Sequence, residues 1–118
     1  MQVISERKIS PTKDSNPIFY GGEVTSQPLV GDGLGTDFNF NIVNFSPGAK
    51  NQFHTHTSDQ ILYVIRGKGI IATDHEEVEI TVGDTAFIPS GERHWHGATD
   101  ESHFSHIALL GRDNKTTF

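Results

Sequence analysis

The sequence predicts an all-β fold, a sandwich or barrel of short antiparallel strands. Strand-like runs recur at regular spacing with turn signals between them, and no segment has a helical period. The 12 glycines and 5 prolines among 118 residues fit a chain with many turns. This length is close to that of one compact domain. We therefore expect a single domain spanning 1–118, in which residues 1–16 form a polar N-terminal arm.

The strands can be placed in order from their patterns. Residues 2–4 of the arm predict one short strand, and residues 18–25 a second strand that two glycines interrupt. Residues 38–45 alternate aromatic or aliphatic side chains with asparagine, which is the period of a strand with two different faces. A turn at 74–76 predicts a hairpin. The remaining predicted strands cover 53–56, 60–66, 69–73, 77–82, 85–88, 93–97 and 104–110.

Charge and composition exclude several functions. With 9 Lys and Arg against 15 Asp and Glu, the net charge is −6. Such a chain repels nucleic-acid phosphates and anionic membranes. No apolar run is long enough to cross a bilayer. Cysteine is absent, so neither disulfides nor thiolate metal ligands are possible. We expect no nucleic-acid or membrane partner and a cytoplasmic location.

The histidines carry the chemical signal. All seven lie between positions 54 and 106, and four of them form two pairs spaced two residues apart. His54 and His56 share one face of their strand, as do His94 and His96, so each pair can meet one metal ion. Gln60 opens the next strand after a short turn, and a hairpin-like return would bring its side-chain carbonyl to the same place.

These residues stand in two motifs that resemble those of the cupin family. In the first, Gly48 is followed by His54, His56, Gln60 and Gly67; in the second, Gly83 is followed by Pro89, Gly91 and His94. The resemblance implies a small antiparallel barrel that binds one divalent metal ion through His54, His56, Gln60 and His94. The chain also resembles a subgroup of bacterial single-domain cupins that includes manganese-dependent hydroxynitrile lyases and cupins associated with carboxymuconolactone decarboxylases.

Two positions depart from the family pattern. Gln60 stands where the first motif usually has glutamate, and Ala98 where the second often has asparagine. The asparagine is not a metal ligand, so its loss changes little. Three neutral imidazoles and a neutral amide leave a divalent ion with its full double charge, whereas a carboxylate would halve it. A more positive centre is a stronger Lewis acid and lowers the pKa of bound water further.

The resemblance also implies a pocket beside the metal. His96 is either a hydrogen-bonding partner that orients other groups or a pocket acid or base. His106 is either a bonded core histidine or, as the resemblance favours, a general base with an ordinary pKa near working pH. Ala108 and Leu110 share the strand face of His106. His75 and His103 are expected to be exposed.

The strand at 38–45 allows two orientations. Its alternation alone would turn Phe38, Phe40 and Ile42 inward. Alignment with the family instead turns Asn41 and Val43 toward the metal pocket, leaving the aromatic face to pack against another layer or subunit. We adopt the second orientation, with a substrate pocket lined by Asn41, Val43, Ala108 and Leu110.

Three functions remain open. The first is a metalloenzyme that polarises a small hydroxy, keto or cyano-alcohol substrate, acting as a lyase, decarboxylase or isomerase. The second is a dioxygenase of the quercetinase, diketone or thiol type, and the third is a non-catalytic small-molecule-binding cupin. Resemblance favours Mn or Fe as the ion, while Ni, Co and Zn also suit this ligand set. A homodimer is expected by resemblance, supported by Phe38, Phe40 and Trp95, which we place outside the pocket.

Overall fold

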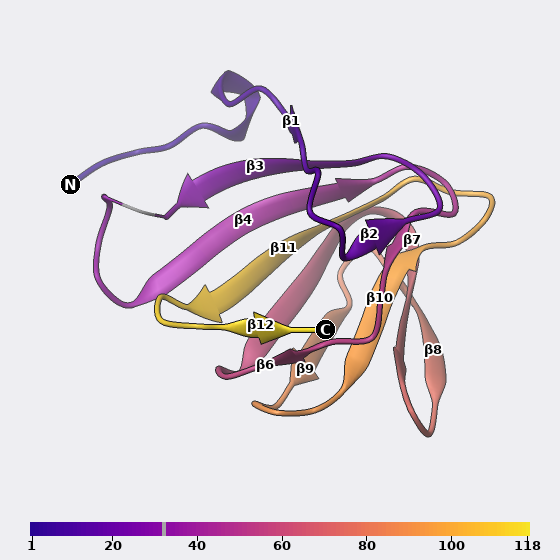
Figure 1. Cartoon of the computed structure of the whole chain (residues 1–118). Coiled ribbons are helices and arrows are strands. Elements are labelled where there is room, and N and C mark those ends of the chain that lie inside the picture. The colour runs from indigo at the N-terminus through magenta and orange to yellow at the C-terminus, as the bar shows by residue number, and fades with distance from the viewer. Residues whose placement is uncertain (32) are drawn as a thin grey trace.

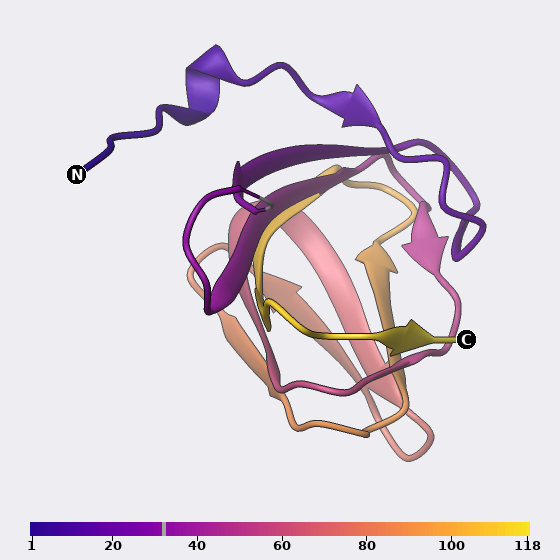
Figure 2. The ribbon, with the colours of Figure 1, turned by 60° about the vertical axis from the view of Figure 1, so that its left-hand side comes forward.

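The fold is a curled antiparallel sheet that forms a half-barrel (Figures 1 and 2). The computed structural model describes residues 1–31 and 33–118, which hold twelve strands and one short 3-10 helix. All strand pairings within this part of the chain are antiparallel. The elements are η1 (Glu6–Lys8), β1 (Thr12–Lys13), β2 (Phe19–Tyr20), β3 (Val24–Val30), β4 (Phe38–Phe45), β5 (Lys50–Asn51), β6 (Thr55–His56), β7 (Gln60–Thr73), β8 (Glu77–Thr81), β9 (Thr85–Ile88), β10 (His94–Ala98), β11 (Phe104–Gly111) and β12 (Thr116–Thr117).

Strand β7 links the two halves of the sheet. Its first half pairs with β11 and β9, and its second half with β10 and β8. The sequence predicted two strands here, but the structure has one strand of 14 residues. Gly67 lies at φ +70°, and Gly69 is packed so closely that a Cβ would stand 2.6 Å from the Phe104 ring. The two glycines, which looked like a strand end, instead let one strand pass closely under the segment that enters β11.

The inner face of the barrel carries the hydrophobic core. Along β7, Gln60, Leu62 and Val64 are buried, whereas Ile61 and Tyr63 point outward and are exposed. This alternation fits a sheet with one buried face. Two apolar clusters fill the interior, one made of Val24, Phe45, Ala49, Val64, Ile80, Ala98 and Phe104, the other of Leu62, Ile88 and Ala108.

Strand β4 turns its asparagine and valine face inward. Val43 packs against both apolar clusters, and Asn41 shares its face by the period of the strand. Ile42 is buried on the opposite face, where its neighbour in β3 is Gln27. The N-terminal arm passes over these strands (Figure 2). The chain's own arm is therefore a covering layer for part of this outer face.

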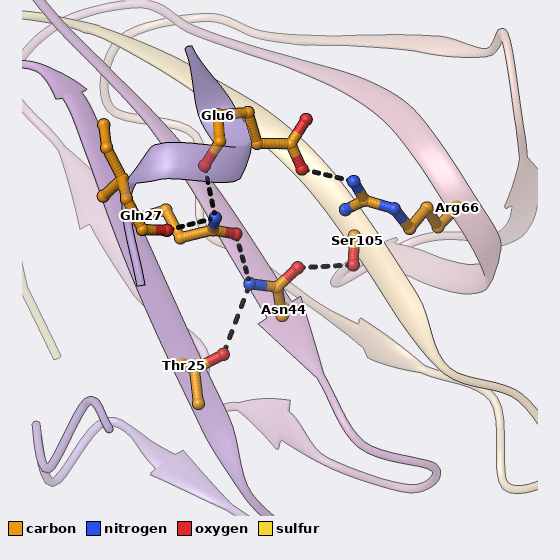
Figure 3. Close-up of polar contacts among 7 residues, drawn as sticks. Glu6, Thr25, Gln27, Asn44, Arg66 and Ser105 are labelled. Atoms are coloured by element: carbon orange, nitrogen blue, oxygen red, sulfur yellow. Dashed lines mark hydrogen bonds and ion pairs between the residues drawn. The ribbon is translucent and has the colours of Figure 1, made fainter. Parts of the chain in front are cut away.

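Polar side chains hold the arm in place (Figure 3). The Gln27 amide donates to the backbone carbonyl of Ile9 at 2.9 Å and accepts from Asn44 Nδ2 at 3.0 Å. Glu6 of η1 forms an ion pair with Arg66 of β7. The predicted strand at residues 2–4 is wrong: the arm has η1 and then β1, which pairs with β3. Among the described strands, none pairs with residues 2–4, so their β propensity goes unused.

Other boundaries differ where strands are short or lack a pattern. The predicted strand at 18–25 divides into β2 and the longer β3, and the strand at 53–56 shortens to β6. Neither β5 nor β12 was predicted, because two residues show no periodicity.

Trp95 points out of the pocket as expected, with Lys50 Nζ 5.3 Å from its ring centroid. Phe38 is 56% exposed, and the homodimer stays a prediction. Among the described residues, no helix has the length and apolarity to span a membrane.

Candidate metal centre

Three histidines from distant parts of the chain meet inside the barrel. His54 and His94 form an isolated antiparallel bridge in which each backbone N–H donates to the other's carbonyl, at 2.9 and 3.0 Å. His56 follows two residues later on the same face. One ligand atom from each of these three buried side chains lies within 4.8 Å of the other two. Backbone pairing thus brings the two sequence motifs together.

Gln60 lies against the same cluster. It opens β7, is 4% exposed, and places Oε1 3.2 Å from His94 Nε2. Two ligand atoms each about 2.1 Å from one ion at right angles would be about 3 Å apart. The observed separation fits two neighbouring ligands of a common ion, and Gln60 as a ligand stays a prediction.

Hydrogen bonds fix which nitrogen of each histidine faces the centre. His54 Nδ1 donates to the Gln52 carbonyl at 2.7 Å, and His94 Nδ1 donates to the Glu92 carbonyl at 2.9 Å. A carbonyl oxygen only accepts, so Nδ1 carries the proton in both neutral rings. The Nε2 lone pairs are then free for a metal. Such bonds from the far nitrogen are the usual way in which ligating histidines are oriented.

The C-terminal strand orients His56. Strand β12 pairs with β6, and Thr116 Oγ1 lies 2.9 Å from His56 Nδ1. Asn114 Nδ2 lies 3.3 Å from Thr116 Oγ1 and 3.3 Å from His56 Nδ1, so two side chains near the C-terminus contact this side of the ring. His56 Nε2 is buried without a hydrogen-bond partner in the described chain. No described protein group therefore competes with a metal ion for this nitrogen.

Burial keeps these histidines neutral. Loss of solvation, partly offset by the bond to Gln52, lowers the pKa of His54 to about 4. The same loss, together with the nearby His94, lowers the pKa of His56 to about 4. Burial also lowers the pKa of His94. Neutral imidazole is the form that binds metal ions, so the cluster is ready for an ion at neutral pH.

Two further histidines extend the cluster into the core. His96 and His106 are 4% and 1% exposed, and their ring centroids are 4.9 Å apart. Burial lowers the pKa of His106 to about 4 and holds that of His96 well below its usual value. Neither nitrogen of His106 has a hydrogen-bond partner among the described residues, and neither does His96 Nδ1. His75 and His103, in contrast, are exposed.

The predicted pocket residues lie on the inner face beside these rings. Ala108 packs in the cluster with Leu62, and Leu110 shares the face of Ala108 and His106 on β11. Val43 lies across from His106 in the pairing of β4 with β11, and Asn41 across from Ala108. All four positions are thus near the histidine cluster, and their contact with a substrate stays a prediction.

Two surface pockets reach the metal-candidate histidines. One, of about 720 Å³, has His54, Phe53, Arg93 and Tyr20 in its lining. The other, of about 120 Å³, has His94 in its lining and lies against β7 and β9. Each pocket thus touches one histidine of the cluster from the surface, and His56 and Gln60 line neither of them.

Sequence reasoning missed the residues that orient the histidines. Thr116 and Asn114 lie about 60 positions from His56, and Asn51 contacts His96 from the two-residue strand β5. No motif or periodicity marks these side chains. The only usable signal was the principle that a ligating histidine needs an outer partner, which does not say where that partner lies in the sequence.

The donor set fits a divalent transition metal. The three imidazoles are neutral, and the outward bonds of His54 and His94 leave their Nε2 atoms free. His94 Nε2 and Gln60 Oε1, both acceptors, stand closer together than two lone pairs prefer without a cation between them. Nitrogen donors of this kind suit zinc, copper, iron and nickel, among others.

Comparison with known proteins finds two kinds of enzyme among the curated relatives of this chain. Part of the chain is 39% identical over 71 residues to an (R)-mandelonitrile lyase from Granulicella tundricola, covering 59% of this chain and 54% of that protein. It is also 32% identical over 80 residues to an acireductone dioxygenase from Nostoc sp., covering 56% of this chain and 44% of that protein. The matches thus span about half the length of these curated relatives.

Solved structures extend the likeness to nearly the whole fold. A crystal structure of a cupin-like protein from Thermotoga maritima superposes with a TM-score of 0.81 at 32% identity, covering 88% of this chain and 82% of that one. Residues 41–108, more than half of the chain, match the family model Cupin_2, described as a cupin domain. The match includes every histidine of the cluster. The chain therefore belongs to the Cupin_2 family of cupin domains.

Proposed function

We propose that this cupin is a small metalloenzyme whose single divalent ion is held by Nε2 of His54, His56 and His94 and by Oε1 of Gln60. The observation that carries the proposal is the 3.2 Å approach of Gln60 Oε1 to His94 Nε2, within a cluster of neutral imidazoles. Mn and Fe are the favoured ions, and Co, Ni and Zn also suit the ligands. An all-neutral ligand set leaves the ion its full double charge.

The substrate class follows from that charge and from the pocket. When bound, the ion supplies a Lewis acid for an oxygen of a small hydroxy, keto or cyano-alcohol substrate. The apolar side chains of Val43, Ala108 and Leu110 would surround the substrate's carbon skeleton. The relative named as an (R)-mandelonitrile lyase supports a cyano-alcohol as the first substrate to test.

His106 is the proposed proton acceptor. Both of its nitrogens are buried without a protein partner, and its pKa of about 4 keeps the ring neutral. A neutral imidazole with a free lone pair can take the proton of a substrate hydroxyl as the bond beside it breaks. The low pKa limits its strength as a base, so His106 would accept the proton only from a hydroxyl made more acidic by a bound ion.

Reconstitution tests this function. Metal-free protein is loaded separately with Mn²⁺, Fe²⁺, Co²⁺, Ni²⁺ and Zn²⁺, and each form is assayed for mandelonitrile cleavage. We expect activity only with metal, and loss of turnover but not of metal in His106→Gln. The control His75→Gln changes an exposed histidine and should behave as wild type. Equal activity of the metal-free and loaded proteins would overturn the proposal.

The second candidate is a dioxygenase. The similarity to an acireductone dioxygenase favours it, and three imidazoles with an amide leave coordination positions for two further ligands on a six-coordinate ion. The discriminating measurement is oxygen consumption by the iron-loaded protein with diketone, flavonol, thiol and acireductone substrates. Oxygen uptake that depends on both iron and one of these substrates would favour the dioxygenase over the lyase.

A further inference from the structure

The side chain of Asn51 contacts His96 at two points. Asn51 lies on β5, is 4% exposed, and its strand pairs with β10. Its Oδ1 accepts a hydrogen bond from the backbone N–H of His96 at 2.8 Å, and its Nδ2 lies 3.1 Å from His96 Nε2. One amide thus holds both the backbone and the ring of the same residue.

These two contacts determine where the His96 ring carries its proton. A backbone N–H can only donate, so the amide atom facing it must be the oxygen. The other end of the amide is then the NH₂ group, which also only donates, so His96 Nε2 must accept. An accepting Nε2 places the proton of the neutral ring on Nδ1. A doubly protonated ring would direct an N–H at the NH₂ group, so the same contact disfavours it.

The resulting Nδ1–H has no hydrogen-bond partner in the part of the chain that the structure describes. It is buried, and no acceptor within hydrogen-bond distance is present among residues 1–31 and 33–118. A buried donor without an acceptor is costly, and native proteins almost always satisfy it with a protein group, water or a ligand. The His96 ring lies 4.9 Å from that of His106 and 5.9 Å from that of His94, between the proposed base and the proposed metal ligands.

We propose that Asn51 is a positioning residue that holds His96 as its Nδ1–H tautomer, so that His96 donates a hydrogen bond to the ligand of this barrel. The ligand class is a small molecule with an oxygen or nitrogen lone pair, an oxygen anion above all. His96 therefore cannot act as a general base through Nδ1, which leaves His106 as the proton acceptor of the pair. The ligand-binding part rests on the proposed function, whereas the tautomer does not.

Nitrogen-15 NMR of the imidazole rings tests the tautomer directly. The protonated and unprotonated nitrogens of a neutral ring have well-separated shifts, and the His96 signals are assigned by their loss in His96→Gln. We expect Nδ1 to be protonated in both the metal-free and the Zn²⁺-loaded wild-type protein. A protonated Nε2 in the wild type would overturn the proposal.

Asn51→Asp replaces the donating NH₂ group with an accepting oxygen and leaves the side-chain volume nearly unchanged. Both carboxylate oxygens accept hydrogen bonds. One can still accept from the backbone N–H of His96, and the other can form a hydrogen bond to the ring only if Nε2 carries a proton. We expect Nε2 to become protonated in this variant. The matched control is Asn39→Asp, since Asn39 makes no hydrogen bond to a histidine in the described chain, and it should leave His96 unchanged. A folded Asn51→Asp protein with an unprotonated Nε2 would refute the role of Asn51. If this variant does not fold, the proposal is tested by the tautomer of His96 in the wild type, where a protonated Nε2 would refute it.

Acetate serves as the probe for the ligand-binding part. In the Zn²⁺-loaded wild type, acetate should shift the His96 Nδ1–H resonance to lower field, as a new hydrogen bond does, and His96→Gln should weaken acetate binding. Acetate binding that leaves this resonance unmoved would refute donation by His96. A chain that binds no metal yet has the expected tautomer would refute the proposed function while leaving the role of Asn51 intact.

Discussion

Lowering the pH from 7 to 5 should destabilise the metal-free protein by at least about 4 kcal/mol. Burial lowers the pKa of His54 and of His106 to about 4 in the folded state, whereas both rings titrate at 6.5 when unfolded. Between these values the unfolded chain binds protons that the folded chain does not. Stability from these groups is therefore present above pH 6.5 and is lost as the pH falls toward 4.

The magnitude follows from the width of that window. At pH 5 the solution is about 1.5 units below the unfolded pKa, and each unit corresponds to about 1.4 kcal/mol, so each histidine contributes about 2 kcal/mol. His56, His94 and His96, whose pKa values burial also lowers, add to the loss. Because small domains have about 5–15 kcal/mol of stability in total, the effect is large.

Urea unfolding measures this loss of stability between pH 7 and pH 5, with the fluorescence of Trp95, the single tryptophan, as the signal. The metal-free protein is unfolded at pH 7 and at pH 5, and the two free energies are subtracted. His106→Gln should reduce this difference by about 2 kcal/mol, and the exposed control His75→Gln should leave it unchanged. A difference below about 1 kcal/mol in the wild type would refute the inference that the buried histidines stay neutral.

Three further changes should have separate effects. Thr116→Val removes the hydroxyl bonded to His56 Nδ1 and should weaken metal binding about tenfold in calorimetry; unchanged affinity would contradict its orienting role. Gly67→Ala places a Cβ at φ +70° and 1.7 Å from a carbonyl oxygen, so urea unfolding should show a loss above about 2 kcal/mol. Its control Gly91→Ala, at φ +83° with open space, should cost only about 1 kcal/mol. Gln60→Glu should bind the divalent ion more tightly yet turn over more slowly, because a carboxylate neutralises part of the charge; weaker metal binding would exclude position 60 as a ligand.

The positions of the histidines could be predicted because a strand repeats every two residues. His54 with His56, and His94 with His96, had to share a face once their segments were assigned to strands. A hairpin-like return already placed Gln60 near His54 and His56. The resemblance added the pairing of the two motifs, which spacing alone does not supply. The inward face of β4 also came from the resemblance, since its aromatic pattern by itself favours the opposite orientation.

The rest of the site depends on contacts between distant segments. Thr116 reaches His56 only because β12 pairs with β6, and Asn51 reaches His96 only because β5 pairs with β10. These strands have two residues each, too few for a periodic signal. The sequence analysis also missed that β7 is continuous. Gly67 and Gly69 suggest the end of a strand when the sequence is read alone, but in this fold they allow a close approach between two backbone segments.

Diffraction data collected at the absorption edge of the loaded metal test the central claim most directly. Crystals of the Mn²⁺-loaded protein should give one anomalous peak per chain, within bonding distance of Nε2 of His54, His56 and His94 and of Gln60 Oε1. Crystals of the His54→Ala variant, loaded with Mn²⁺ in the same way, should show a weakened peak or none. A strong peak elsewhere in the chain, or a full peak that persists in His54→Ala, would contradict the account.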